Sequence, residues 1–319
     1  MKYILKMKFL ARIIFLVSSA AILAYVYNAC SDDFIQMYEY FSFAKKLILK
    51  PKCLFSYNIA VPDYMNVKSK AQIHTVNACI FVLLMNKDLC DLITTIIQFE
   101  KNFNHKYNYP YVLMSDEEFT DEFKATIQKY TRSKIEFGFI LREEWMVPEW
   151  IDEPKLVKSI DTIGKNTGYR HLCRYYSGFF FRHELTLKYE YYMRLDPHVN
   201  FPCEIKEDPF LKMVKNNISY GFVLAAPEAL FTIPTLWENI KEWKTKNLKE
   251  TEIDEKALSY ISEDNGETLS NSLCMFYNNF EMGAFSLFRN EKYLSYFNHL
   301  DQSKGFYHER WVSRYFKVF

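Results

Sequence analysis

The stretch ACIFVLLM, residues 78–85, constrains the fold more than any other part of the sequence. It is apolar throughout and only as long as a strand, and a strand without polar positions is typical of a parallel sheet covered on both faces. Residues 88–103 follow with Leu92, Ile96 and Phe99 at helical spacing, which predicts an amphipathic helix. A buried strand followed at once by such a helix indicates a βαβ unit.

The same alternation continues to residue 140. Strands connected through helices form a mainly parallel sheet with right-handed crossovers, an α/β fold that binds its ligands beyond the carboxyl ends of the strands. The sequence contains neither GxxxxGKS/T nor GxGxxG, which disfavours a P-loop and a dinucleotide-binding fingerprint. We expect further strands at 109–115, 134–140, 189–195 and 219–226, and further helices at 118–130, 170–183 and 233–246.

The N-terminal residues predict a membrane anchor. Residues 13–30 carry no charge, basic residues precede them, and Asp32 and Asp33 follow. A helix of this length spans about 27 Å, close to the hydrocarbon thickness of a thin bilayer, and basic residues before it place the N-terminus in the cytosol. A cleaved signal peptide is the alternative, because residues 18–21 are small. We therefore expect a cytosolic tail at 1–12, a transmembrane signal anchor at 13–30, a stem at 31–70 and a lumenal domain at 71–319.

Charge and cysteine content narrow the class of protein. Lys and Arg number 40 against 39 acids, so no basic excess points to nucleic acid. In an oxidising lumen six cysteines could form disulfides, in an order that the sequence leaves open. The sequon Asn217-Ile218-Ser219 is consistent with that compartment. These six are Cys53, Cys79, Cys90, Cys173, Cys203 and Cys274, while Cys30 lies at the membrane edge.

A polar cluster interrupts the apolar pattern in YYMRLDPHVNF, residues 191–201. Arg194, Asp196 and His198 come at the carboxyl end of the strand expected at 189–195. Taken alone, the cluster predicts a strand end and a turn, because Pro and Asp favour turns and Pro cannot donate to a sheet. Its place at a strand's carboxyl end also puts it where open α/β sheets bind ligands.

Several sequence blocks, in order from Asn77 to Trp311, together resemble one protein family. They include NACIFVLLMNKDL, YPYVLMSDEEFTDEFK, GYRHLCRYYSGFFFRH, YYMRLDPHVNFPCEI, YGFVLAAPE, FYNNFEMG and GFYHERW. The chain resembles the fungal Golgi α-1,2-mannosyltransferase family. The resemblance implies a GT-A-like fold, GDP-mannose as donor, a divalent ion (usually Mn²⁺) and transfer of mannose, with retained configuration, to a mannose-containing glycoprotein or glycolipid. It also implies a type II protein of the Golgi membrane and leaves room for association with sibling transferases.

The resemblance implies roles for particular residues. Asp196 takes the place of the family's metal-binding acid, and Arg194 would serve the same site through fixed charge near the donor's phosphates. Glu281 aligns with the family's candidate nucleophile, although composition alone favours a turn residue there. Tyr169 matches a tyrosine of the nucleotide and acceptor cleft, with an ordinary core tyrosine as the alternative. His198 stands where the family has Asp, and a metal ligand, an indirect role and a turn residue all stay open.

The sequence also departs from the family pattern. Met85 replaces an Arg that would contact the nucleotide, Ser313 falls where the family has an active-site acid, and a later metal-binding His has no counterpart, since His308 comes too early. Two functions are therefore expected as alternatives. One is a working retaining mannosyltransferase with a weakened metal site. The other is a catalytically impaired paralogue that binds nucleotide or partners sibling transferases, and a mannoside-binding module is a more distant third.

Overall fold

The computed structural model describes residues 61–65, 76–249, 262–263, 268–269 and 273–312. The expected cytosolic tail and signal anchor lie outside these residues, as does the stem except for 61–65. Within the part of the chain that is described, no helix is long and apolar enough to cross a membrane.

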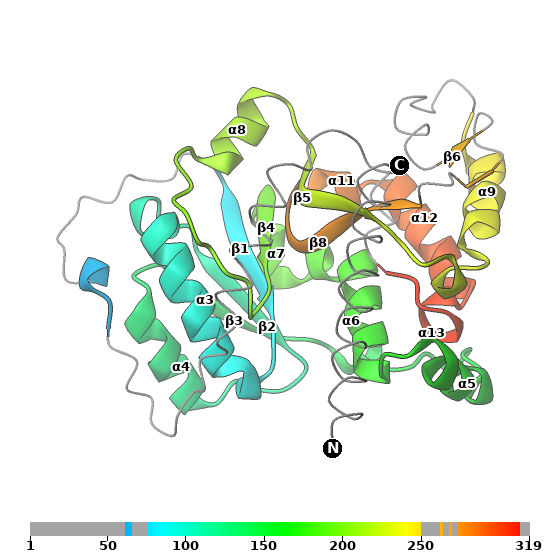
Figure 1. The fold of residues 1–319 in the computed structure, drawn as a ribbon, viewed down its shortest axis with the longest axis horizontal. Helices are drawn as coiled ribbons and strands as arrows, with labels where there is room; N and C mark the ends of the chain where they lie inside the picture. Colours follow the sequence, from blue (N-terminus) through cyan, green and yellow to red (C-terminus); the bar gives the residue numbers. More distant parts are fainter. Residues whose placement is uncertain (1–60, 66–75, 250–261, 264–267, 270–272, 313–319) are drawn as a thin grey trace, which may run out of the picture.

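A six-stranded sheet forms the centre of the molecule, with helices on both faces (Figure 1). Its strand order is β3-β2-β1-β4-β8-β5. The first four strands pair in parallel, whereas β8 runs antiparallel to both of its neighbours. The strands are β1 (Ala78–Leu83), β2 (Tyr111–Ser115), β3 (Ile135–Phe139), β4 (Tyr191–Leu195), β5 (Tyr220–Pro227) and β8 (Cys274–Ala284); β6 (Ser262–Glu263) and β7 (Thr268–Leu269) pair separately.

Helices cover the two faces of the sheet unequally (Figure 1). One face carries α3 (Leu89–Asn102), α4 (Asp121–Ile127) and α8 (Pro209–Lys215). The other carries α5 (Glu153–Ile163), α6 (Thr167–Gly178), α9 (Leu236–Asn247), α11 (Ser286–Arg289), α12 (Glu291–Gln302) and α13 (Gly305–His308). The remaining α-helix in the described part is α7 (Glu184–Leu187); the short 3-10 helices include η2 (Asn86–Asp88), η5 (Arg142–Glu144), η6 (Phe180–Arg182) and η7 (Leu230–Thr232).

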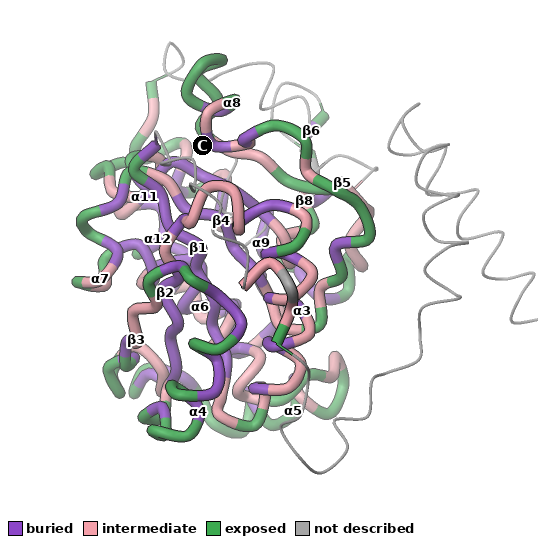
Figure 2. The backbone as a smooth tube through the Cα atoms, turned by 90° about the vertical axis from the view of Figure 1, so that its left-hand side faces the viewer, coloured by how far each residue is buried: buried purple, intermediate pink, exposed green. Residues whose placement is uncertain are grey.

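The strand β1 explains why two cores form. All six of its residues are buried, as the continuous apolar run predicts, and the middle of the sheet is buried throughout (Figure 2). Because side chains alternate along a strand, Phe81 packs into the core beneath α6, whereas Ile80 and Val82 pack into the core beneath α3. The predicted α/β class with a mainly parallel sheet is confirmed.

The expected elements are confirmed in order, with differences of a few residues at their ends, but the strands β6, β7 and β8 and several helices, among them α5, α8 and α12, were not expected. The block FYNNFEMG lies inside β8, and the interpretation of Glu281 as a turn residue is wrong. Gly283 does not have the positive φ that would mark a turn glycine; among the described glycines only Gly164 has one. Polar residues interrupt β8 in the sequence because it adjoins the site and the sheet's edge strand, rather than lying between two apolar faces.

The cysteines only partly follow the expectation of disulfides. Cys90 is disulfide-bonded, whereas Cys79 and Cys203 are free thiols. Cys79 is completely buried in β1, and this burial raises the pKa of its thiol far above the usual range. It is therefore an apolar core residue, which accounts for its place in the buried run. Cys30 and Cys53 lie outside the described residues.

Candidate active site

The pairing of β4 with β8 brings the predicted site residues together. Arg194 on β4 and Glu281 on β8 are direct partners in the antiparallel register. Residues paired in this way carry their Cβ atoms about 5 Å apart on the same face of the sheet. Asp196 follows immediately after β4 ends. Three of the four predicted residues therefore meet at the carboxyl end of β4.

Arg194 and Asp196 form a two-pronged ion pair. The guanidinium Nε of Arg194 donates to Oδ1 of Asp196 at 2.8 Å, and its Nη2 donates to Oδ2 at 2.9 Å. The ring of Tyr176 lies against the guanidinium, with its centroid 3.6 Å from Cζ. The Arg194 side chain is only 5% exposed, but that of Asp196 is 26% exposed. The ion pair therefore holds a carboxylate in a fixed orientation at a surface that a ligand can reach.

Burial and charge act against each other at this pair. Burial raises the pKa of the Asp196 carboxyl above its ordinary value, and the adjacent Arg194 offsets only part of this rise. The same carboxylate raises the pKa of Arg194, so the guanidinium stays charged. An arginine that is nearly inaccessible and fully engaged by Asp196 positions that carboxylate in this structure. Its role in binding the donor's phosphates stays a prediction.

Glu281 is completely buried and held by two tyrosines. The hydroxyl of Tyr192 donates to Oε1 at 3.1 Å, and that of Tyr220 donates to Oε2 at 2.6 Å. Burial, and then the nearby Glu281, raise the pKa of both tyrosines, so both stay protonated and can donate. Each carboxylate oxygen thus receives one hydroxyl donor, and the side chain is fixed between β4 and β5.

Tyr169 lies in the first turn of α6, apart from the other predicted site residues. Asn166 caps this helix by accepting from the backbone N–H of Tyr169 at 3.0 Å. Tyr169 and Tyr176 are seven residues apart, so they share one side of the helix about 10 Å apart along its axis. Tyr176 contacts Arg194, whereas the ring of Tyr169 lies 5.2 Å from Nζ of Lys165. The binding role of Tyr169 stays a prediction.

The metal site has to be assessed from the ligands that are present. His198 has a left-handed backbone (φ 74°), its side chain is 65% exposed, and its Nδ1 lies 3.2 Å from Asp91 Oδ1 on α3. Among the described residues, no group of three or more His, Cys, Asp or Glu side chains could hold an ion. Asp196 fits a different kind of site, in which a hard cation takes one protein carboxylate and completes its shell with phosphates and water.

Three tyrosines of the site escaped sequence reasoning: Tyr176, Tyr192 and Tyr220. A signal for Tyr192 was available, because it precedes Arg194 by two positions and therefore shares its face of β4. Tyr176 could have been placed opposite the same strand only after α6 had been docked. Tyr220 meets Glu281 through the pairing of β5 with β8, and no local pattern indicates that pairing.

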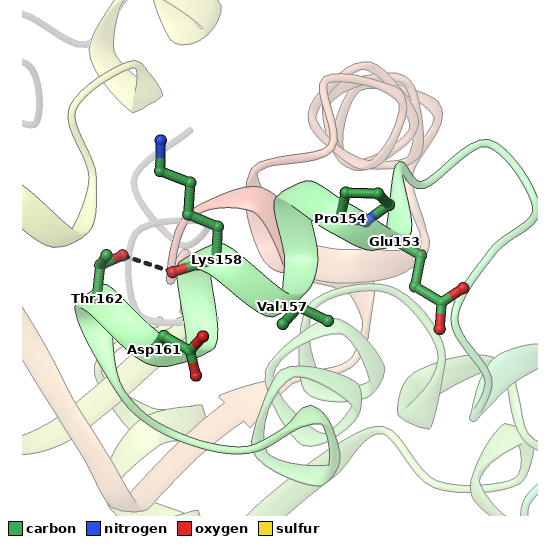
Figure 3. Close-up of a pocket in the computed structure, with 6 residues that line it drawn as sticks. All are labelled: Glu153, Pro154, Val157, Lys158, Asp161 and Thr162. Carbon is green, nitrogen blue, oxygen red and sulfur yellow. Dashed lines mark hydrogen bonds between the residues drawn. The ribbon is translucent and has the colours of Figure 1, made fainter.

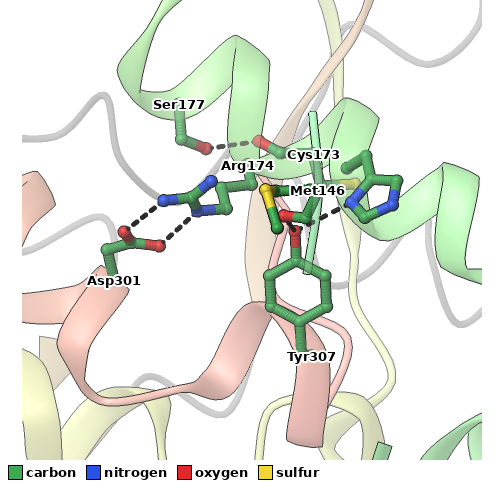
Figure 4. Close-up of polar contacts among 7 residues, drawn as sticks. Met146, Cys173, Arg174, Ser177, Asp301 and Tyr307 are labelled. Atoms are coloured by element: carbon green, nitrogen blue, oxygen red, sulfur yellow. Dashed lines mark hydrogen bonds and ion pairs between the residues drawn. The ribbon is translucent and has the colours of Figure 1, made fainter. Parts of the chain in front are cut away.

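A second polar cluster fixes the position of α6 behind the site (Figure 4). Arg174 donates from Nε and Nη2 to the two carboxylate oxygens of Asp301 on α12, at 2.7 and 2.8 Å. Its neighbour Tyr307 donates to the carbonyl oxygen of Met146 at 3.1 Å and contacts Nδ1 of His171 at 2.8 Å. Arg174 and Asp301 are both nearly inaccessible to solvent. This cluster therefore connects α6 to α12 through a buried ion pair.

A depression on the molecular surface lies elsewhere. It is open, and its lining comes entirely from α5 (Figure 3). None of the predicted site residues contributes to it. The lining residues are Glu153, Pro154, Val157, Lys158, Asp161 and Thr162.

The fold is an α/β domain whose mainly parallel sheet presents an arginine-held carboxylate at the end of β4, beside a buried glutamate on β8. The sequence profile of the glycolipid 2-alpha-mannosyltransferase family matches residues 35–316, and the chain belongs to this family. The predicted resemblance is confirmed.

Curated relatives agree with this membership. The chain is 42% identical over 243 residues to the O-glycoside alpha-1,2-mannosyltransferase omh1 of Schizosaccharomyces pombe, covering 74% of this chain and 62% of the relative. It is 38% identical over 256 residues to the glycolipid 2-alpha-mannosyltransferase of Saccharomyces cerevisiae, covering 78% of this chain and 56% of the relative. The chain thus spans about three fifths of the length of these relatives.

Two solved structures share the fold. The core-mannan synthase A (CmsA/Ktr4) of Aspergillus fumigatus, in a Mn/GDP form, superposes with a TM-score of 0.69 at 32% identity. The mannosyltransferase Ktr4p of S. cerevisiae, in complex with GDP, gives a TM-score of 0.71 at 31% identity. In both cases the match covers 79% of this chain and 70% of the other. The domain is therefore similar in fold to these mannosyltransferases.

Proposed function

We propose that the chain is a retaining α-mannosyltransferase that moves mannose from GDP-mannose to a mannoside of a glycoprotein or glycolipid, in α-1,2 linkage. The observation that carries this proposal is the placement of Asp196, held by Arg194, beside the buried carboxylate of Glu281. Family membership supports the reaction class, and the GDP and manganese in the solved relatives support the donor and the ion.

In this proposal Asp196 and Glu281 have different tasks. Asp196 would hold the divalent ion, which neutralises the charge that develops on the diphosphate when the glycosidic bond breaks. Glu281, anchored by Tyr192 and Tyr220, would supply the fixed negative charge that stabilises the oxocarbenium-like carbon. The C1–O bond to the diphosphate breaks, the acceptor hydroxyl forms the new bond to C1, and its proton passes to the leaving diphosphate. Arg194 keeps the Asp196 carboxylate oriented while this happens.

The substitution Glu281→Gln tests the proposal. It keeps the size of the side chain and an acceptor oxygen but removes the negative charge. Because the charge acts on the transition state, transfer of radiolabelled mannose from GDP-mannose to methyl α-mannoside should fall roughly a hundredfold or more. The affinity for GDP, measured by calorimetry, should stay nearly unchanged. A fully active variant would remove Glu281 from the mechanism.

The impaired paralogue remains the second candidate for one reason. Both oxygens of Asp196 are engaged by Arg194, and the described residues supply no three-ligand group for a metal. Such a protein would bind GDP or associate with sibling transferases without transferring mannose. Binding of GDP by a wild-type protein that transfers no mannose to methyl α-mannoside would favour this candidate.

We also propose a type II protein of the Golgi membrane, with a tail at 1–12, an anchor at 13–30, a stem at 31–70 and a lumenal domain at 71–319. Asn217 supports this location, because the sequon lies exposed in the turn between α8 and β5. Protease added to sealed microsomes should spare the lumenal domain. An endoglycosidase should lower the apparent mass of the wild-type protein but not that of Asn217→Gln. Digestion in intact vesicles would reject the orientation.

A further inference from the structure

Three aromatic side chains cluster at the edge of the sheet and are here named the β5–β8 aromatic row: Tyr220, Phe222 and Phe276. The ring centroids of Tyr220 and Phe222 lie 6.1 Å apart, with 29° between the planes. Those of Phe222 and Phe276 lie 4.0 Å apart, with 19° between the planes. Those of Tyr220 and Phe276 lie 6.0 Å apart, with 41° between the planes. Phe222 and Phe276 are therefore stacked, and Tyr220 packs against both of them.

The row is continuous with the candidate catalytic carboxylate. Tyr220 donates its hydroxyl hydrogen to Glu281 at 2.6 Å. Phe222 is the register partner of Glu281 across the β5–β8 pair, so its side chain and the carboxylate leave the sheet on the same face. Phe276 joins the same row through its contact with Phe222. The three rings are thus anchored to Glu281 through Tyr220 and Phe222.

Exposure separates Phe222 from the buried ring on the other side of Glu281. Tyr192, on the inner side of Glu281, is completely buried, whereas Phe222 is 42% exposed. Burying a phenylalanine side chain stabilises a protein by about 1.5–3 kcal/mol. An ordered, stacked ring that forgoes much of this stabilisation beside a catalytic carboxylate indicates a surface that a ligand covers.

We propose that the β5–β8 aromatic row binds the acceptor sugar. This inference rests on the proposed mannosyl transfer. The attacking hydroxyl must come within about 3.5 Å of the reacting carbon, so the acceptor ring lies one sugar ring away from Glu281. Neighbouring strands are about 4.8 Å apart, which puts Phe222 at that distance. The C–H groups of a pyranose carry partial positive charge, and they are attracted to the negative face of an aromatic ring.

Saturation-transfer NMR with methyl α-mannoside tests this without requiring turnover. In the wild-type lumenal domain the ring C–H protons of the sugar should receive saturation. Phe222→Ala should weaken sugar binding roughly three- to tenfold, the size of a typical aromatic contribution, and leave GDP affinity unchanged. Phe222→Trp should restore binding. The matched control is Val223→Ala, because Val223 is the next residue on the same strand and is 58% exposed, but it is not part of the aromatic row.

Unchanged sugar binding in Phe222→Ala would overturn the inference, and so would an equal loss in Val223→Ala. Sedimentation identifies another occupant, because a wild-type dimer that Phe222→Ala converts into monomers would mean that a second copy covers the row. The proposed function fails separately. If the wild-type protein binds methyl α-mannoside through Phe222 but transfers no mannose, the sugar-binding inference stands and the proposed enzymatic function is rejected.

Discussion

The ring of Tyr192 occupies the space that a side chain at Gly283 would need. A Cβ atom built on Gly283 would lie 2.6 Å from Cε1 of Tyr192 and 3.2 Å from its hydroxyl oxygen. The two residues are register partners on β4 and β8. The hydroxyl of Tyr192 donates to Glu281, two residues before Gly283 on β8. The absence of a side chain at Gly283 therefore leaves room for the tyrosine ring that holds this carboxylate.

Gly283→Ala should therefore disturb the site and the fold together. Moving a fully buried ring costs about 1–3 kcal/mol in a well-packed core, and the Tyr192–Glu281 hydrogen bond should lengthen. Urea denaturation would measure the stability, and mannosyl transfer the site. Gly221→Ala on β5 is the matched control: a Cβ there meets nothing within 4 Å, so stability should change by less than about 1 kcal/mol. Equal losses in both variants would contradict the packing argument.

The two tyrosine hydroxyls should matter for turnover rather than for nucleotide binding. Tyr192→Phe and Tyr220→Phe each remove one donor from a buried carboxylate, a bond worth about 1.5–3 kcal/mol when one partner is charged. We expect kcat to fall roughly tenfold or more in each variant with GDP affinity unchanged. Tyr109→Phe is the control, since its buried hydroxyl donates to Asp208 at 2.7 Å on the other side of the sheet. A comparable loss of kcat there would indicate a general packing effect.

Asp196→Ala should abolish the metal dependence of GDP binding. If the ion depends on this carboxylate, wild-type protein binds GDP at least about tenfold more tightly with Mn²⁺ than with chelator, and the variant shows no difference. Asp91→Ala provides the control, because Asp91 is also near the turn but pairs with the exposed His198. Calorimetry that found equal GDP binding with and without Mn²⁺ in the wild type would reject the role of Asp196.

The sequence predicted the parallel half of the sheet well, because strands buried on both faces appear as uninterrupted apolar runs such as residues 78–85. It also placed Asp196 correctly at the end of β4. It failed for β8, whose polar residues and Gly283 resemble a turn when read locally. The contacts of Glu281 depend on which residues of β4 and β5 stand opposite it, and that register is set by the packing of the whole sheet.

The buried pair of Arg174 and Asp301 should be critical for stability. Arg174→Met leaves the Asp301 carboxylate buried without its partner, a loss of about 3–5 kcal/mol. Urea denaturation would measure it. The control is Lys246→Met on α9. The side chains of Lys246 and its partner Glu242 are 63% and 50% exposed, and such pairs contribute about 0.5 kcal/mol or less. A loss below 1 kcal/mol in Arg174→Met would show that the pair is dispensable.

Stability should also depend on the protonation of His171. Burial, and then the nearby Arg174, lower the pKa of His171 to about 4, whereas in the unfolded chain it is about 6.5. The unfolded state therefore binds the proton more tightly. Stability should fall as the pH drops from about 6.5 towards 4, by up to about 3 kcal/mol from this residue.

Urea denaturation between pH 7 and pH 4.5 checks this dependence. His171→Gln should show a shallower loss of stability on acidification than the wild type. Identical slopes in the wild type and His171→Gln would contradict the prediction.

The position of β8 between β4 and β5 has a consequence for how the chain folds. The strands β1 to β4 come from consecutive βα units and can pair as the chain grows. In contrast, the 78 residues 196–273 separate the end of β4 from the start of β8. Until it arrives, β4 is an open edge with unpaired N–H and C=O groups, and such edges promote aggregation. Closing so long a loop is slow, so heterologous production should benefit from low temperature and chaperones during the interval before β8 inserts.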